Sequence, residues 1–263
     1  MKLDYTIWDP TKNITLLVSS PVPRDMQPQV AANLMAQRPQ VEQVGFIEPA
    51  TLPGAVLRLQ MMGGEFCGNA SMSAAAYAAD RDGLAGPEVP LEVSGHEGIL
   101  TCRLERREDG LWGTVNMPLP VEITTAELPG GSAVPAVVFD GIVHCIVPAG
   151  SLSREAANSA IRPLCAALDA DACGIMLYDK AAGAITPLVY VRSTDTAVWE
   201  SGCGSGSAAV GSYLAAQAGK AVTADLRQPG GTITVCADWE NGRVSTLRIT
   251  GRVALVERGS CEL

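Results

Sequence analysis

A segment that occurs twice in the chain constrains its fold more than any other feature. Residues 67–79 (CGNASMSAAAYAA) align without a gap with residues 203–215 (CGSGSAAVGSYLA), and cysteine, glycine, serine, tyrosine and alanine recur in step. Each copy follows a β-like run and opens an alanine-rich helical pattern. Alanine-rich helices can imitate one another by chance, but the shared Cys-Gly pair and the later tyrosine favour a duplication. The repeat therefore predicts two equivalent halves.

The pattern along the rest of the chain indicates an α+β fold. Helix-like segments rich in alanine open with polar residues or proline. They are Gln27–Gln37, Asn69–Ala79, Ser153–Ala167 and Ser205–Ala218. Short runs of β-favouring residues, bounded by turn residues, indicate strands. These runs are Ile14–Ser19, Ala55–Met61, Leu91–Val93, Gly98–Leu104, Ala136–Phe139, Gly141–Val147, Ile185–Arg192, Thr232–Ala237 and Arg243–Val253.

A stretch near the middle of the chain lies between the two copies of the repeat. Residues 118–135 contain several prolines and glycines and lack a helical or strand period. Such a stretch is typical of a boundary, although a long surface loop explains it almost as well. We expect an N-terminal half, residues 1–120, that carries Cys67 and a C-terminal half, residues 121–263, that carries Cys203, unless the chain end returns to the first half.

Charge and composition exclude several classes of partner. The chain of 263 residues has a formal net charge of −9 and a pI of about 4.8. A basic surface for nucleic acid or an anionic membrane is therefore not expected. The first residues lack a signal-peptide pattern, and no run approaches the roughly 18 apolar residues that span a bilayer. We expect a cytoplasmic protein that acts on a small molecule.

The cysteines and histidines do not form a metal-binding pattern. Eight cysteines are scattered singly, without a CxxC pair, which argues against disulfides and structural zinc. Apart from Cys67 and Cys203, they are expected to be buried. His144 lies in an apolar run and is expected to be buried and hydrogen-bonded, whereas His96 lies in a polar turn and is expected to be exposed. We therefore predict no bound metal and no Cys-His nucleophile.

The two Cys-Gly turns have a chemistry of their own. A cysteine at a helix start lies among unpaired backbone N–H groups and at the positive end of the helix dipole, which favours its thiolate. The same N–H groups can hold a carboxylate and stabilise negative charge that develops beside it. A thiolate on one face of an α-carbon and a thiol on the other can racemise an amino acid without a cofactor. The alternative is that both cysteines are buried structural thiols.

The two cysteine blocks resemble a known family. Residues 66–70 (FCGNA) and 202–206 (GCGSG) are similar to the signature blocks of diaminopimelate epimerases, and the similarity extends over nearly the whole chain. The resemblance implies two pseudo-symmetric α/β halves, each a sheet wrapped around a central helix, with the site between them. It also implies paired catalytic cysteines, Cys67 and Cys203, and no cofactor.

The same resemblance implies which residues bind the substrate. Asn13 falls where the family has an asparagine, and Glu42-Gln43 resembles the start of its Asp-Gln-Leu-Leu stretch. The other residues flank the cysteines. The expected substrate-binding residues are Asn13, Glu42, Gln43, Gly68, Asn69, Glu200, Gly204 and Ser205. For Glu42, Gln43 and Glu200 the alternative is a solvated or capping role.

The sequence departs from the epimerase pattern where that family holds the distal end of its substrate. Ile142 and Ala172 stand at asparagine positions, and residues 194–200 (TDTAVWE) contain no arginine to bind a distal carboxylate. The pocket is therefore expected to prefer a neutral or cationic side chain. The cysteine blocks are more similar to the histidine racemases of opine-metallophore biosynthesis, which implies L-histidine as the substrate and D-histidine as the product.

Other functions remain open at this point. Within enzymes, the chain could be a diaminopimelate epimerase or a racemase of another amino acid, and the cysteine blocks match those of proline-type racemases less well. A catalytically inert ligand-binding protein could keep the same fold. Phenazine-type isomerases share the architecture but lack the cysteine pair. A homodimer is possible, and the sequence does not reveal the oligomeric state.

Overall fold

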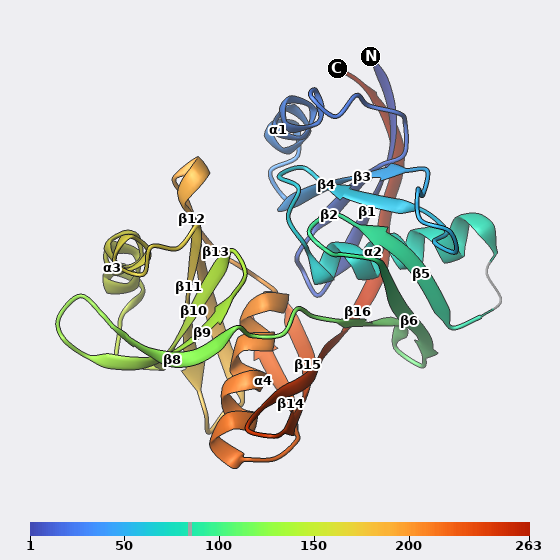
Figure 1. The fold of residues 1–263 in the computed structure, drawn as a ribbon. Helices are drawn as coiled ribbons and strands as arrows, with labels where there is room; N and C mark the ends of the chain where they lie inside the picture. The colour runs from blue at the N-terminus through green and yellow to red at the C-terminus, as the bar shows by residue number, and fades with distance from the viewer. Residues whose placement is uncertain (84–85) are drawn as a thin grey trace. The chain divides into compact units, whose positions relative to one another are not determined.

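The computed structural model describes residues 1–83 and 86–263, which form two compact units (Figure 1). Unit 1 consists of residues 1–116 and 250–263, and unit 2 of residues 117–249. The expected boundary after residue 120 lies close to the observed one, and residues 250–263 return to unit 1. That the two units arose by duplication stays a prediction.

Unit 1 is built on a mixed sheet. Its strands are β1 (Lys2–Pro10), β2 (Thr15–Val18), β3 (Gln43–Glu48), β4 (Arg58–Met61), β5 (Glu88–Val93), β6 (Ile99–Arg107) and β7 (Gly110–Asn116). They are hydrogen-bonded in chain order, and the end of β16 (Arg243–Glu262) pairs antiparallel with β1. The pairs β2–β3 and β4–β5 are parallel, whereas β3–β4 and β5–β6 are antiparallel.

Two helices pack on this sheet. Helix α1 (Gln27–Gln37) buries Val30, Ala31 and Leu34 against apolar side chains of β1, β2 and β3. Helix α2 (Gly68–Asp82) contacts β1, β2, β3, β5, β6 and β7, and every residue from Gly68 to Ala76 is buried. Its glycine, alanine and serine residues allow strands to approach on all sides. As predicted, strands surround a central helix in this unit.

Unit 2 has the same kinds of element in a different order. Its strands are β8 (Glu122–Glu127), β9 (Ala133–Phe139), β10 (Ile142–Pro148), β11 (Ala172–Asp179), β12 (Ala184–Val191), β13 (Thr196–Trp199), β14 (Val222–Gln228), β15 (Gly231–Glu240) and the start of β16. The sheet order is β15-β14-β12-β11-β10-β9-β8, with β13 paired to β12. A single 3-10 turn, Arg192–Thr194, precedes β13.

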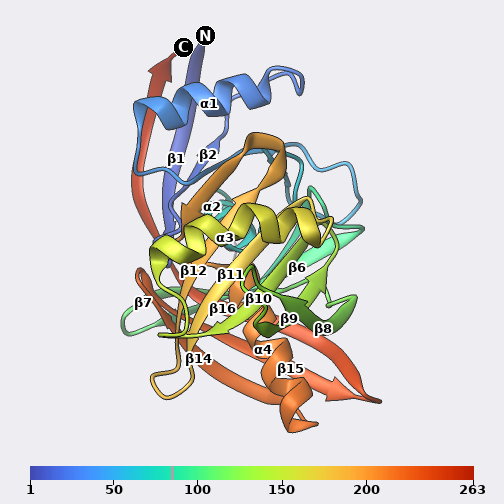
Figure 2. The ribbon, with the colours of Figure 1, turned by 90° about the vertical axis from the view of Figure 1, so that its left-hand side faces the viewer.

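The two helices of unit 2 cover opposite faces of this sheet. Helix α3 (Arg154–Ala167) lies across β10, β11 and β12 in the view of Figure 2. It buries Ile161 and Leu164 in a core that also contains Cys145 of β10 and Ile175 of β11. Helix α4 (Gly204–Ala218) contacts β8 to β11, β14 and β15. The side of β11 that faces α4 carries Met176, whose sulfur lies against Gly206.

The predicted α+β class is confirmed, and all four predicted helices are present with ends that differ by at most three residues. Each predicted strand overlaps an observed one. The strands that the sequence analysis missed are β1, β3, β7, β8, β11, β13 and β14. Residues 118–135 were expected to lack strands, and this was wrong, because β8 lies there. Its side chains are mostly exposed and it pairs only with β9, so no alternating pattern marks it.

Within the ranges given above, no helix is long and apolar enough to cross a membrane.

Candidate active site

Cys67 caps the N-terminus of α2. Its backbone is extended, and its sulfur accepts a hydrogen bond from the N–H of Ala70 (3.4 Å). The hydroxyl of Ser71 donates to the carbonyl of Cys67 (2.7 Å) and closes the first turn. Cys67 is half-buried. The sulfur therefore lies where the free N–H groups of the helix converge, as the sequence predicts.

Cys203 caps α4 in the same way. Its sulfur accepts a hydrogen bond from the N–H of Gly206 (3.2 Å), and the hydroxyl of Ser207 donates to its carbonyl (2.7 Å). Each helix also ends at a left-handed glycine, Gly83 in α2 and Gly219 in α4. The two copies of the repeat thus have the same local geometry from cysteine to terminal glycine.

A chain of polar side chains leads to the sulfur of Cys67. The thiol donates to Oε1 of Gln43 (3.0 Å), and Nε2 of Gln43 donates to Oδ1 of Asn13 (2.6 Å). Nδ2 of Asn13 donates in turn to the carboxylate of Glu42 (2.8 Å). Asn13 lies in the turn after β1, and Glu42 and Gln43 lie at the start of β3. The fold therefore brings three residues that were expected to bind substrate close to Cys67. In this structure their side chains form hydrogen bonds with one another.

Two residues that the sequence analysis missed support this arrangement. Thr15, which is fully buried, accepts a hydrogen bond from Nε2 of Gln43 (2.7 Å). The hydroxyl of Ser94 donates to the carbonyl of Glu65 (2.9 Å) and accepts from the N–H of Met61 (2.9 Å), so it ties the segment before Cys67 to β4. Gln43 is 28 positions from Thr15, and Glu65 is 29 positions from Ser94, so no local motif marks either residue.

Several effects act on the pKa of the Cys203 thiol. Burial and a nearby carboxylate raise this pKa, whereas hydrogen bonds at the start of α4 lower it. The side chain is 2% exposed. Burial raises the pKa of the Cys203 thiol well above its usual range, and the nearby carboxylate of Glu200 raises it further. Hydrogen bonds from Ser205 and from the N–H of Gly206 lower it. The thiol form is therefore favoured in the protein without substrate.

Gln228 is a third residue that the sequence analysis missed. Its Oε1 accepts from the N–H of Cys203 (2.7 Å), and its Nε2 donates to the hydroxyl of Ser207 (2.8 Å). Gln228 is at the end of β14, directly before Pro229, Gly230 and Gly231. This side chain therefore holds the backbone N–H of Cys203 directly and, through the hydroxyl of Ser207, its carbonyl.

The remaining predicted site residues lie in the first turns of the two helices or beside them. Gly68 and Asn69 open α2 and are buried, and Gly204 and Ser205 open α4. Glu200 lies between β13 and α4, and its N–H donates to the carbonyl of Pro187 (3.0 Å). Unit 1 therefore gathers its predicted residues around Cys67, and unit 2 gathers its own around Cys203.

The histidine predictions hold in part. His96 is exposed, as predicted, and its ring lies near that of Phe66. His144 is fully buried, but among the described residues neither of its ring nitrogens has a hydrogen-bond partner. The prediction that it is hydrogen-bonded was therefore wrong, because its neighbours across β9 and β11, Val137 and Gly174, carry no polar side chain. Burial lowers the pKa of His144 to about 4.

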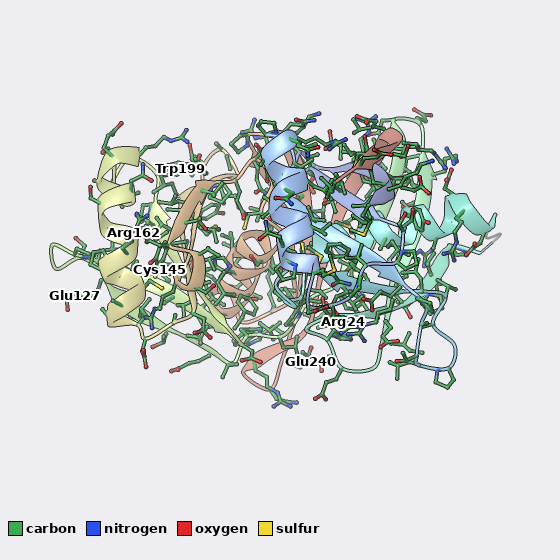
Figure 3. The ribbon with its side chains drawn as sticks, turned by 90° about the horizontal axis from the view of Figure 1, so that it is seen from above. Arg24, Glu127, Cys145, Arg162, Trp199 and Glu240 are labelled. Carbon is green, nitrogen blue, oxygen red and sulfur yellow. The ribbon has the colours of Figure 1, made fainter. Side chains whose placement is uncertain are left out.

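Most of the other cysteines are buried. Cys102, Cys145, Cys165 and Cys173 are buried, whereas Cys236 and Cys261 are half-buried, so the expectation of burial was wrong for these two. Figure 3 labels Cys145 beside α3, the helix that carries Arg162. Over residues 1–83 and 86–263, no three side chains of histidine, cysteine, aspartate or glutamate gather as a metal site requires.

Solved structures with a similar fold include a phenazine biosynthesis protein and an epimerase. The chain aligns over its whole length with a phenazine biosynthesis protein of the PhzF family from Bacillus anthracis, with a TM-score of 0.71, 12% identity and 100% of both chains covered. It also aligns with a hydroxyproline epimerase from Agrobacterium vitis, with a TM-score of 0.69 and 13% identity, covering 98% of this chain and 92% of that one. At these identities the likeness establishes the fold alone.

Sequence similarity gives the family. The chain is 28% identical over 268 residues to a histidine racemase from Staphylococcus aureus, covering 98% of this chain and 96% of the relative. Fold and relatives together define the class of this protein, an amino-acid racemase and thus an isomerase. More narrowly, it belongs to the family described as "Histidine racemase CntK N-terminal domain", whose model matches residues 2–261. The predicted resemblance to histidine racemases is confirmed.

Proposed function

We propose that this racemase interconverts L-histidine and D-histidine without a cofactor, with Cys67 and Cys203 as its acid and base. The observation that carries the proposal is the matched pair of caps: each cysteine ends a hydrogen-bond-rich turn and points its sulfur at the free N–H groups of a buried helix. Membership in the histidine racemase family supports histidine as the substrate.

The mechanism follows from the chemistry of these caps. One sulfur, as a thiolate, takes the α-proton, and the other, as a thiol, returns a proton to the opposite face of the same carbon. The mechanism therefore requires both sulfurs to reach one substrate carbon. Backbone N–H groups at the helix starts hold the substrate carboxylate and stabilise the negative charge that appears on it when the α-proton leaves. The roles of the two cysteines exchange when the other enantiomer binds.

The identity of the substrate side chain is proposed from residues of the diaminopimelate epimerases that this sequence lacks. Ile142 and Ala172, which replace asparagines of the diaminopimelate epimerases, are direct partners in the parallel pair β10–β11. Burying a second carboxylate beside them would cost several kcal/mol without a cationic partner. An imidazole is compact, and its ring N–H can donate to a carboxylate such as that of Glu42. Gln43, Asn69, Glu200 and Ser205 complete the proposed set of polar groups around the substrate.

The substrate is tested by incubating the protein separately with L-histidine and with LL-diaminopimelate and resolving the products by chiral chromatography. We expect D-histidine to form, with a kcat/KM for histidine at least about 100-fold above that for diaminopimelate, which corresponds to about 2.7 kcal/mol. A kcat/KM for diaminopimelate equal to or above that for histidine would refute the choice of substrate. It would leave the two-cysteine mechanism untouched.

Three further expectations belong to the same proposal. A histidine racemase of this type would act in the cytoplasm, consistent with the acidic composition and with cysteines that are scattered along the sequence without a CxxC pair. Its product would serve the biosynthesis of a histidine-containing metallophore, as the resemblance implies. A homodimer is the expected assembly, which analytical ultracentrifugation at micromolar concentration would test.

A further inference from the structure

The hydrogen bonds around Cys67 have a direction that the side chains themselves determine. A carboxylate accepts hydrogen bonds and donates none, so the amide group of Asn13 must turn its Nδ2 toward Glu42. Its Oδ1 then faces Gln43, which must turn its own Nε2 toward Asn13. The carbonyl oxygen of Gln43 is left facing the sulfur of Cys67. The orientation of each amide group is thus fixed by its hydrogen-bond partners. The series of hydrogen bonds ends at the sulfur of Cys67.

Thr15 fixes the same amide independently. The single hydroxyl hydrogen of Thr15 is donated to the backbone carbonyl of Asn13 (3.0 Å), so its oxygen is available to Gln43 only as an acceptor. It accepts the second hydrogen of Nε2 (2.7 Å). If the amide of Gln43 were turned over, its oxygen would face two acceptors. Because Thr15 is fully buried, water does not replace the lost bonds easily.

We propose that Thr15 and Asn13 are positioning residues that present the carbonyl of Gln43, and not its NH2 group, to Cys67, so that Cys67 awaits the substrate as a thiol. A carbonyl oxygen accepts a hydrogen bond from S–H but offers nothing to a thiolate, whereas an NH2 group would favour the thiolate. Within the proposed two-cysteine mechanism, on which this inference rests, Cys67 is therefore the proton donor in the first turnover. Cys203, whose thiol form is also favoured without substrate, must lose its proton when substrate binds before it can act as the base.

The step that this assignment implies is balanced. The S–H bond of Cys67 breaks as a C–H bond forms at the α-carbon, and the bonding electrons stay on sulfur as a thiolate. The carbanion's electron pair forms the new C–H bond. The α-proton lost from the substrate is held by the other sulfur, so the protein gains and loses one proton in each turnover.

The test measures the alkylation of Cys67 in the absence of substrate, so it does not depend on histidine being the substrate or on racemase activity. The full-length protein and the variant Thr15→Val, which is close in shape but cannot accept a hydrogen bond, are treated with iodoacetamide at one pH. Alkylation is followed peptide by peptide with mass spectrometry. Cys236, which is half-buried and lies in unit 2, serves as the internal reference.

We expect Cys67 to be alkylated about three to ten times faster in Thr15→Val, the change that corresponds to the net worth of one hydrogen bond. The rate at Cys236 should not change. Thr15→Ser keeps the hydroxyl and should leave the rate at Cys67 within about twofold of the starting protein. An unchanged rate at Cys67 in the folded valine variant, or an equal rise in the valine and serine variants, would overturn the proposal.

A second variant keeps the test decisive if Thr15→Val does not fold. Gln43→Met removes the carbonyl acceptor itself while keeping the length of the side chain, so alkylation of Cys67 should again rise relative to Cys236. A rate equal to that of the starting protein would show that the carbonyl does not hold Cys67 as a thiol.

Discussion

For the substitution Gly211→Ala, helix propensity predicts a more stable protein, whereas the structure predicts a less stable one. Gly211 lies in the middle of α4, where replacement of glycine by alanine normally stabilises a helix by about 1 kcal/mol. In this structure a Cβ at Gly211 would lie 2.4 Å from Cγ2 and 2.9 Å from Cγ1 of Val235 on β15. Both methyl groups belong to a stiff, fully buried side chain.

The free-energy cost of the clash should exceed the free energy gained from the higher helix propensity of alanine. Relieving a contact about 1 Å too short requires α4 or β15 to move, and overpacking of this kind costs about 1–3 kcal/mol. Because Val235 is fully buried, we take the upper end of this range, about 3 kcal/mol. Subtracting the gain of about 1 kcal/mol in helix propensity leaves Gly211→Ala destabilised by about 2 kcal/mol. For a protein of this size that lowers Tm by roughly 4–8 °C.

The assay is thermal or urea unfolding of four proteins that form a cycle: the unmodified chain, Gly211→Ala, Val235→Ala and the double variant. Val235→Ala removes the methyl groups that clash, so the double variant should be more stable than the sum of the two single changes predicts, by about 1 kcal/mol or more. Gly86→Ala, at a non-helical position, is the control for adding a Cβ that meets nothing within 4 Å. If Gly211→Ala kept or raised Tm, the packing argument for α4 would be wrong.

Three further predictions concern the cysteines. Cys67→Ala and Cys203→Ala should each lower racemisation by at least about 1000-fold, whereas Cys236→Ala should not, and wild-type turnover in either active-site variant would contradict the pair. Glu200→Gln should speed alkylation of Cys203 at pH 8, because loss of the carboxylate lowers the pKa of that thiol and increases its thiolate; an unchanged rate would exclude this role. Air oxidation without substrate should inactivate the protein by forming a disulfide between Cys67 and Cys203, and a reductant should restore activity. Loss of activity with both thiols still titratable would count against this disulfide.

The sequence was most informative where structure is local. The helix starts at Cys67 and Cys203 could be predicted because capping depends on a few neighbouring residues, and the repeat marked both. The four helices followed from alanine content and from the polar residues that open them. The two cysteine blocks also carried the resemblance to histidine racemases, and the match to that family's model confirms it.

The sequence was least informative where partners are distant along the chain. Gln228 lies 25 positions from Cys203, and Ser94 lies 29 from Glu65, so no local pattern could connect them. Strand β11 was missed because it is buried on both faces, between α3 and α4, and so shows no alternation of polar and apolar residues. The hydrogen-bonded state of His144 was predicted wrongly, since it depends on the side chains of neighbouring strands.

The measurement that tests the central claim most directly is the initial fate of the α-proton when L-histidine is racemised in deuterated water. With one sulfur on each face of the carbon, the D-histidine formed should carry deuterium at the α-position, while the unreacted L-histidine should keep its proton during the first turnovers. Proton NMR and mass spectrometry of the separated enantiomers measure the deuterium content of L-histidine and of D-histidine. D-Histidine that retains the substrate's own α-proton, or deuterium that enters L-histidine as fast as D-histidine appears, would contradict the two-cysteine account.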